Sequence, residues 1–387
     1  MYSKDYIERF CNDSFTERPF CDADNIALCG ISYMTFENVV SDSFDAEPMP
    51  FDEMCRRTYI YNGNRHIAVG LVLPKGISVQ MMEMARHKRF AEIKCVGFTD
   101  TFSVTPAVQF AAGTLLLPDG TVVVIYRGTD DTLVGWKEDT DILTTKGTPS
   151  HKLAVEYLEK VAAKFKGDII VCGHSKGGNM AQCAALYCSK EVRDRIKLLY
   201  NNDGPGFWNY EFINSEAYKE LLPRYRHILP SASAVGTMLF HDDDYIVVKS
   251  KRLLGPLQHD ISTWSLKNNT ELDDIAELDT LGKVNDLVYA GIFGTVSDRA
   301  AAEFEKVATA VVEGIGQRGL LGVSRHPISS YKGMKKAWRS FDTETRAIVS
   351  GVFAGAGKVV KDSVKAVRNG RFTTVAERMA SIASRNE

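Results

Sequence analysis

The stretch that decides the fold is DIIVCGHSKGGNMAQCAAL, residues 168–186. Its first part is short and continuously apolar, as expected of a central parallel strand that is buried on both faces. A helix pattern begins in its second part and runs from about Gly177 to Cys188. The five residues between them, GHSKG (173–177), fit the G-x-S-x-G pattern of a nucleophile elbow in the strand–turn–helix context that the pattern requires. We therefore predict Ser175 as a nucleophile on a sharp turn.

The glycines Gly173 and Gly177 have a steric role in this prediction. Strand and helix must pass closely on either side of Ser175, and a residue without a side chain leaves that room. The turn would raise Ser175 Oγ above the sheet edge, at the positive N-terminal end of a helix whose N–H groups can stabilise an oxyanion. The backbone N–H of Lys176, the residue after the nucleophile, is the first expected donor.

The segments around this stretch alternate between strand and helix patterns. We expect a hairpin from QFAAGTLLL and TVVVIYRG, a helix over 150–166, and further strands or strand-like stretches at KLLYNND, RHILP, TMLF and YIVVKS. This alternation predicts an α/β fold with a doubly wound, mostly parallel sheet. From Glu271 to Arg378 almost everything is typical of helix. We therefore expect a hydrolase-type domain over residues 1–270 and a helical C-terminal extension over 271–387.

A serine nucleophile needs a general base, and in this fold the order along the chain is serine, acid, histidine. The histidines after Ser175 stand at positions 227, 241, 259 and 326. His227 lies inside a predicted core strand, and His326 lies in the helical part. We favour His259 over His241, because a loop after the last strand-like stretch can reach back over the sheet edge to the serine.

Two carboxylates compete for the role of the acid. Asp203 ends the strand KLLYNND, so it would lie at the same sheet edge as Ser175. Asp244 belongs to the turn HDDDY and is the alternative. The segment after the strand RHILP, SASAVG (231–236), holds no acid at all. We favour Asp203.

The second oxyanion donor is expected from YRGTDDTLVGWKED, residues 126–139. Thr129 follows the strand TVVVIY closely and can offer both a backbone N–H and a hydroxyl. Trp136 and Asp139 are expected to hold this loop in place.

Composition narrows the class of protein further. The chain has 387 residues with 47 basic and 49 acidic side chains, a net charge of −2 that argues against nucleic-acid binding through bulk charge. No signal peptide or apolar span is evident, and the eight cysteines form no C-x-x-C pair, so we expect reduced thiols and a cytoplasmic location. We expect no metal and no cofactor. The oligomeric state is not indicated.

One helix in the C-terminal part combines apolar and basic sides. It is expected to run from Asp342 or Thr343 to Arg368, with Asn369-Gly370 as its stop. Such a helix most often packs on its own domain, and the alternative is peripheral membrane contact through residues 342–368.

Taken together, these motifs resemble a known family. YRGT followed by GWKEDTD resembles the signature of class 3 lipases, and GHSKGG resembles their nucleophile elbow. With NNDGPGF, HDDDYIVVKS and QHD, the set resembles a bacterial lipase-like branch of the α/β-hydrolases that is called Mbeg-like and is largely without assigned substrates. The resemblance covers about residues 20–270. It implies carboxylester hydrolysis with Ser175 as nucleophile, Thr129 as oxyanion residue and His259 as base.

The acid departs from the class 3 pattern. Those lipases place it after a later strand, where this chain has SASAVG, whereas Asp203 comes one strand earlier, which resembles pancreatic-type lipases. The function expected from the sequence is a serine hydrolase that cleaves small-molecule or lipid esters. The alternative is a non-catalytic scaffold that binds a protein or membrane partner through its helical C-terminal part.

Overall fold

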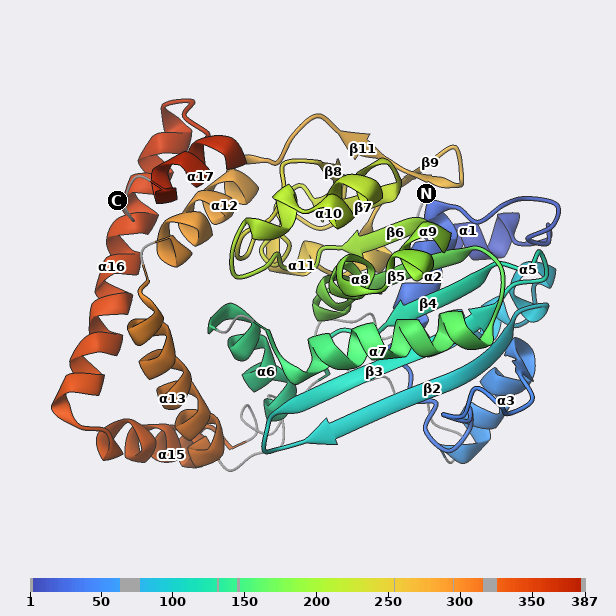
Figure 1. Ribbon diagram of the computed structural model, residues 1–387, viewed down its shortest axis with the longest axis horizontal. Coiled ribbons are helices and arrows are strands. Elements are labelled where there is room, and N and C mark those ends of the chain that lie inside the picture. The colour runs from blue at the N-terminus through green and yellow to red at the C-terminus, as the bar shows by residue number, and fades with distance from the viewer. Residues whose placement is uncertain are drawn as a thin grey trace.

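A nine-stranded sheet forms the centre of the molecule (Figure 1). The computed structural model describes residues 3–62, 77–130, 132–144, 147–253, 255–294, 296–315 and 326–383. The strands follow one another across the sheet in the order β1-β2-β3-β4-β5-β6-β7-β8-β11. Their bounds are Met49–Pro50 (β1), Lys94–Ser103 (β2), Val108–Leu116 (β3), Val122–Tyr126 (β4), Ile169–His174 (β5), Ile196–Asn202 (β6), Tyr225–Pro230 (β7), Tyr245–Val248 (β8) and Asp274–Ile275 (β11).

The five central strands, β4 to β8, are parallel and lie side by side in chain order. The outer strands are antiparallel, and β3 and β4 form the predicted hairpin. Every residue of β4 and β5 is buried, as their continuous apolar sequence predicts. Because parallel strands end at the same edge, the residues after β4, β5 and β6 are brought together there. The prediction of an α/β fold with a mostly parallel sheet is confirmed.

Helices cover both faces of the sheet, and each face has its own apolar core. The side chains of β5 alternate between the two cores, with Ile170 and Cys172 in one and Ile169 and Val171 in the other. One face carries the helices that connect the strands, and the other carries helices from the N-terminal segment. The connecting layer comprises α6 (Leu133–Thr144), α7 (Pro149–Lys164), α8 (Lys176–Tyr187), α9 (Lys190–Arg195) and α10 (Glu216–Leu221), and the N-terminal layer comprises α1 (Ser3–Phe10), α2 (Asp22–Ile31), α3 (Phe51–Tyr61), α4 (Ile77–Met84) and α5 (Lys88–Ala91).

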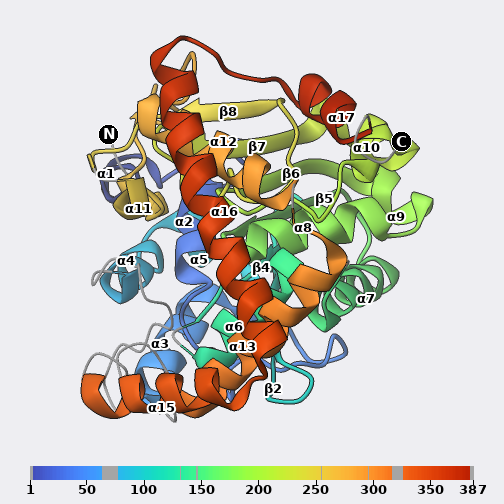
Figure 2. The same cartoon turned by 90° about the vertical axis from the view of Figure 1, so that its left-hand side faces the viewer.

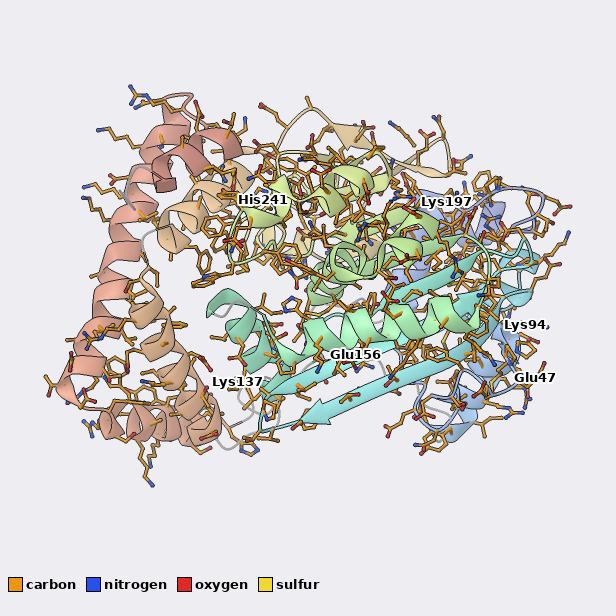
Figure 3. The ribbon with its side chains drawn as sticks, viewed as in Figure 1. Glu47, Lys94, Lys137, Glu156, Lys197 and His241 are labelled. Atoms are coloured by element: carbon orange, nitrogen blue, oxygen red, sulfur yellow. The ribbon has the colours of Figure 1, made fainter. Side chains whose placement is uncertain are left out.

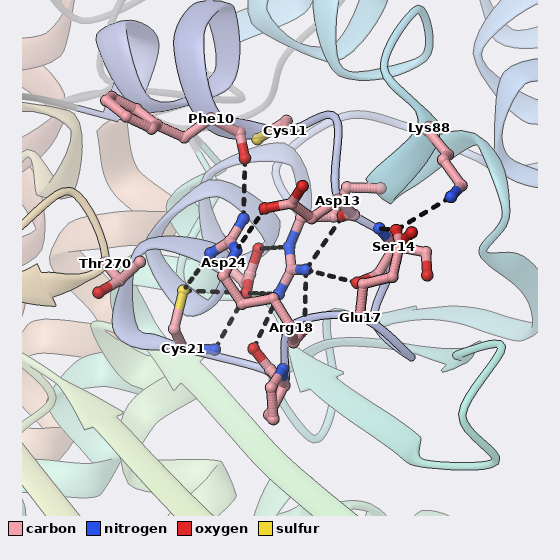
Figure 4. A network of polar contacts seen from close by, with 12 residues as sticks. Phe10, Cys11, Asp13, Ser14, Glu17, Arg18, Cys21, Asp24, Lys88 and Thr270 are labelled. Atoms are coloured by element: carbon pink, nitrogen blue, oxygen red, sulfur yellow. Dashed lines mark hydrogen bonds and ion pairs between the residues drawn. The ribbon is translucent and has the colours of Figure 1, made fainter.

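A buried ion pair joins two of the N-terminal helices. Asp24 of α2 and Arg89 of α5 are both fully buried and form a salt bridge of 2.6 Å. Arg18 donates to the Phe10 carbonyl oxygen and the Cys21 thiol close by, and Thr270 accepts from the start of α2 (Figure 4). The N-terminal segment, which shows few motifs in sequence, is thereby a fixed layer of the fold.

Short elements follow the last parallel strand. They are α11 (Gly255–Gln258), a small hairpin of β9 (Leu266–Lys267) and β10 (Glu271–Leu272), and a 3₁₀ turn at Ile261–Thr263. Two further 3₁₀ turns, at Glu211–Asn214 and Leu222–Arg224, lie between β6 and β7. The expectation that almost everything from Glu271 is helix does not hold for β10 and β11. Strand β10 pairs with β9, and β11 pairs with β8 and extends the sheet to residue 275. The stretch TMLF is no strand either: it contributes an isolated bridge between Phe240 and Phe207.

A frame of helices stands beyond the sheet edge at which β4 to β8 end (Figures 1 and 2). It consists of α12 (Thr280–Phe293), α13 (Asp298–Ile315), α15 (Pro327–Ser340), α16 (Thr343–Arg368) and α17 (Val375–Ala383). The bounds of α16 are those predicted, with Asp342 as N-cap accepting from Thr345 N and with Gly370 at a φ of 68° after its end. No described helix is both long and apolar enough to span a membrane. The division into domains at residue 270 stays a prediction.

Candidate active site

Ser175 occupies a strained turn between β5 and α8. Its φ of 59° and ψ of −133° lie outside the regions that residues with a side chain usually adopt. A Cβ at Gly173 would overlap the carbonyl oxygen of Gly177, and a Cβ at Gly177 would overlap that of Tyr126. Strand, turn and helix therefore pass as closely as the sequence argument requires. The first N–H groups of α8, including that of Lys176, have no partner within the helix.

Asp203 and His259 form a buried hydrogen-bonded pair at the same sheet edge. Asp203 directly follows β6 and is fully buried, and its Oδ2 accepts from His259 Nδ1 at 2.7 Å. Because a carboxylate only accepts, His259 carries its proton on Nδ1 and leaves Nε2 free to accept one. Among the described residues, no hydrogen bond joins Ser175 Oγ to this imidazole. Catalytic hydrogen bonds are often long without a substrate and tighten when it binds.

The segment SASAVG contains no acid, but it donates hydrogen bonds to the carboxylate of Asp203. Ser233 Oγ and the Gly236 N–H donate to Asp203 Oδ1 at 2.5 and 3.0 Å. Asn285 of α12 in turn donates to the Ser233 carbonyl oxygen at 2.9 Å. The helical frame thus contacts the turn that fixes Asp203, which sequence reasoning missed because these residues are far apart in the chain.

The alternatives His241 and Asp244 belong to other contacts. His241, labelled in Figure 3, is buried between the Asp242 carbonyl oxygen at 2.7 Å and Asp286 Oδ1 at 3.0 Å. The backbone N–H of Asp244 donates to Asp242 Oδ1 within its own turn. Neither of the two is hydrogen-bonded to Ser175 or His259, so the geometry favours Asp203 and His259.

Thr129 lies beside Ser175 but its hydroxyl is engaged. A Cβ at Gly128 would come within 3.1 Å of Ser175 Cβ, which places the loop after β4 against Ser175. Thr129 Oγ1 lies 2.8 Å from both carboxylate oxygens of Asp139, so its proton points to Asp139. Its backbone N–H is therefore the donor that remains for an oxyanion. Trp136 is 37% exposed and is not among the partners of Thr129.

Asp139 titrates close to neutral pH. Burial raises the pKa of its carboxyl to about 6, while the charge of Lys176 and the hydrogen bond from Thr129 act in the opposite direction. The acceptor of the Thr129 hydroxyl is thus ionised above that pH and protonated below it.

The side chain of Lys176 turns away from the site into the interior. It is 2% exposed, and its Nζ donates to Gln109 O and Oε1 at 2.7 Å and to Glu138 Oε2 at 3.0 Å. Lys176 would therefore serve an oxyanion through its backbone alone. Glu138 belongs to the motif GWKED, and this motif is the one sequence feature that could have pointed to the buried ion pair of Lys176 and Glu138.

His174 and Tyr33 were missed by sequence reasoning. His174 Nε2 donates to the His259 carbonyl oxygen at 2.8 Å, so its Nδ1 is unprotonated and accepts from the Tyr33 hydroxyl at 2.8 Å. Burial and the neighbouring His259 hold the pKa of His174 well below its ordinary value, which keeps the ring neutral. A histidine inside the G-x-S-x-G pattern was the only local signal.

The structure also places the cysteines and the possible metal ligands of the described residues. All eight cysteines are free thiols, and seven of them are buried. The described residues contain no cluster of three or more His, Cys, Asp or Glu side chains placed to hold a metal ion.

The comparisons with known proteins bear on the region just described. The model of the Mbeg1-like family matches residues 84–298, which include Ser175, Asp203, His259 and Thr129. Among solved structures, M37 lipase is similar, with 16% sequence identity over 56% of this chain and 70% of its own and a TM-score of 0.35. No curated protein matches. Since the family model covers more than half of the chain, the chain belongs to the Mbeg1-like family.

Proposed function

We propose that this protein is a serine hydrolase that cleaves carboxylic esters, lipid or other acyl esters among them, through Ser175, His259 and Asp203. The observation that carries the proposal is the buried Asp203–His259 pair at the sheet edge where Ser175 stands on a strained elbow. A strained non-glycine residue persists only where its surroundings impose it, and such residues cluster at active sites.

The proposed reaction uses Ser175 Oγ and His259 Nε2, while His259 Nδ1 is hydrogen-bonded to Asp203. Ser175 Oγ attacks the ester carbonyl carbon while His259 Nε2 takes its proton, and Asp203 stabilises the imidazolium through Nδ1–H. The oxyanion is stabilised by the backbone N–H groups of Thr129 and Lys176. Collapse of the tetrahedral intermediate releases the alcohol, which receives the proton from His259, and water then hydrolyses the acyl-serine by the same steps.

The test combines a fluorophosphonate probe with p-nitrophenyl esters of short and medium chain length. Wild type should be labelled on one serine and should release p-nitrophenolate, and Ser175→Ala should lose both. Removal of the nucleophile of a triad typically lowers kcat by about 10⁶-fold. Ser350→Ala, which changes an exposed serine of α16, is the matched control and should behave as wild type.

Two outcomes would contradict the proposal. Full ester hydrolysis by Ser175→Ala would move the chemistry to another residue. Folded wild type that neither reacts with the probe nor turns over any ester would support the non-catalytic scaffold instead.

A further inference from the structure

Helix α15 presents a strongly basic face to solvent. Its sequence, PISSYKGMKKAWRS, contains four cations and no carboxylate. All four are exposed and line a shallow hollow together with Ser340. We name them the α15 basic face: Lys332, Lys335, Lys336 and Arg339.

The charges of this face are uncompensated. None of the four makes an ion pair among the described residues, whereas exposed lysines elsewhere, such as Lys190 and Lys249, do. Residues 326–383 hold eleven Lys and Arg against four Asp and Glu, in a chain whose net charge is −2. The four neighbouring positive charges repel each other. An anionic partner would relieve this repulsion and would not have to displace an existing carboxylate partner.

Two large apolar side chains accompany the cations. Ile328 is 72% exposed and Tyr331 is 58% exposed, and the Lys335 ammonium lies 5.8 Å from the centre of the Tyr331 ring. Residues three or four positions apart lie on the same side of a helix, so Ile328, Tyr331 and Lys335 share one side. The combination of exposed aliphatic, aromatic and basic groups is typical of helices that lie in a lipid interface.

Helix α15 packs on α13 through its opposite side, which leaves the basic face exposed. Gly333 and Gly314 bring α15 and α13 into backbone contact, since a Cβ at either position would meet the other's carbonyl oxygen. Ser330 is buried on that side. The helix is thus anchored through small residues at the outer corner of the helical frame (Figures 1 and 2), and its basic face is exposed.

We propose that the α15 basic face binds an anionic lipid surface, with its lysines and arginine on headgroup phosphates and Ile328 and Tyr331 at the headgroup–acyl boundary. This assigns the contact to α15 rather than to the sequence-predicted helix over 342–368. In α16, Val359 packs against Gly291 of α12, so part of its apolar side is already used inside the protein. The exposed Ile328 favours lipid over nucleic acid. A lipid surface has an acyl region that an aliphatic side chain can enter, and nucleic acid has none.

The experiment is flotation with vesicles in the Ser175→Ala background. Because this background lacks the proposed nucleophile, the readout does not depend on ester hydrolysis. The protein should float with vesicles of phosphatidylcholine and phosphatidylglycerol at low salt, not with phosphatidylcholine alone, and high salt should release it. Replacing Lys332, Lys335 and Lys336 by Gln should weaken binding roughly 100-fold, at about tenfold or less for each charge.

A matched control removes the same charge elsewhere. Lys94, Lys160 and Lys166 are exposed and form no ion pair among the described residues, and Lys94 lies at the opposite end of the molecule (Figure 3). Their combined change to Gln should leave flotation unchanged. Ile328→Ser, which keeps every charge, should weaken binding without altering its salt dependence.

The proposal is overturned by any of three results. These are equal loss in the control and the α15 variant, no flotation of wild type with anionic vesicles at low salt, and tight binding to single- or double-stranded nucleic acid without flotation.

Discussion

At the residue scale, both carboxylate oxygens of Asp203 accept hydrogen bonds. One carboxylate oxygen faces His259 Nδ1, and the other accepts from Ser233 and Gly236. In Asp203→Asn, the side-chain oxygen can still accept from one set of donors, but the N–H₂ group then faces the other donor, His259 Nδ1–H. His259 can meet that group only by moving its proton to Nε2, and Nε2 could then no longer act as the base proposed for Ser175.

Asp203→Asn is therefore expected to keep the fold and lower kcat by roughly 10⁴-fold, as the wrong histidine tautomer does in serine proteases. Asp244→Asn, which changes the alternative acid, should leave kcat within a few-fold of wild type. The measurement is kcat on a p-nitrophenyl ester, with circular dichroism to verify folding. The reverse ranking of the two variants would make Asp244 the acid.

Asp139 leads to a prediction about pH. Burial raises its pKa from 3.8 to about 6, so the folded state binds its proton more tightly than the unfolded state does. This group therefore makes the free energy of unfolding fall as pH rises from about 4 to 6. In Asp139→Asn that contribution is absent, so the variant should gain about 1–3 kcal/mol relative to wild type between pH 4 and pH 7. Urea unfolding of both proteins at several pH values measures the difference, and parallel pH profiles would refute the assignment.

At the scale of elements, α17 is attached by one buried ionic contact. Arg378 donates to both oxygens of Asp286 in α12, at 2.7 and 2.5 Å, and His241 donates to the same carboxylate. Burial acts to raise the pKa of Asp286, but the charges and hydrogen bonds of His241 and Arg378 outweigh it and lower that pKa to about 2. Removing Arg378 takes two hydrogen bonds and one full charge from the buried Asp286 and leaves His241 as its remaining partner.

Arg378→Met should therefore cost about 3–5 kcal/mol and release α17. Arg371→Met, at an exposed position nearby, should have little effect. In wild type the contribution of Asp286 is complete above about pH 4 and is lost as pH falls towards 2, because the unfolded carboxyl has the higher pKa. Hydrogen exchange of α17 measures both effects. Protection that is the same in Arg378→Met and wild type would show that α17 is held by other contacts.

Local sequence signals predicted some elements well and others not at all. The ends of α16 were predictable because an N-cap aspartate and an Asn-Gly stop act within their own turn of helix. Strands β10 and β11 have two residues each, and β11 exists only through its pairing with β8. No periodicity can build up over two residues, so this pairing was not predictable.

At the scale of the whole molecule, some parts of the site depend on local sequence signals and others on contacts between distant residues. The turn at Ser175 and the contact between Asp203 and His259 could be anticipated because each residue follows a recognisable strand or loop signal, while their catalytic roles stay a prediction. Tyr33 and His174 are separated by 141 positions, and Asn285 reaches Ser233 from 52 positions away. Such contacts depend on how layers pack after the chain has folded, and a single sequence carries no local trace of them.

The sequential order of the parallel strands has a consequence for biosynthesis. Because β4 to β8 lie side by side in chain order, each new strand can join the edge left by the one before, as the ribosome delivers it. The Asp203–His259 pair cannot form before residue 259 has been synthesised, and the support from Asn285 arrives later still. A nascent chain thus completes its parallel sheet before the residues of the candidate site can all come together.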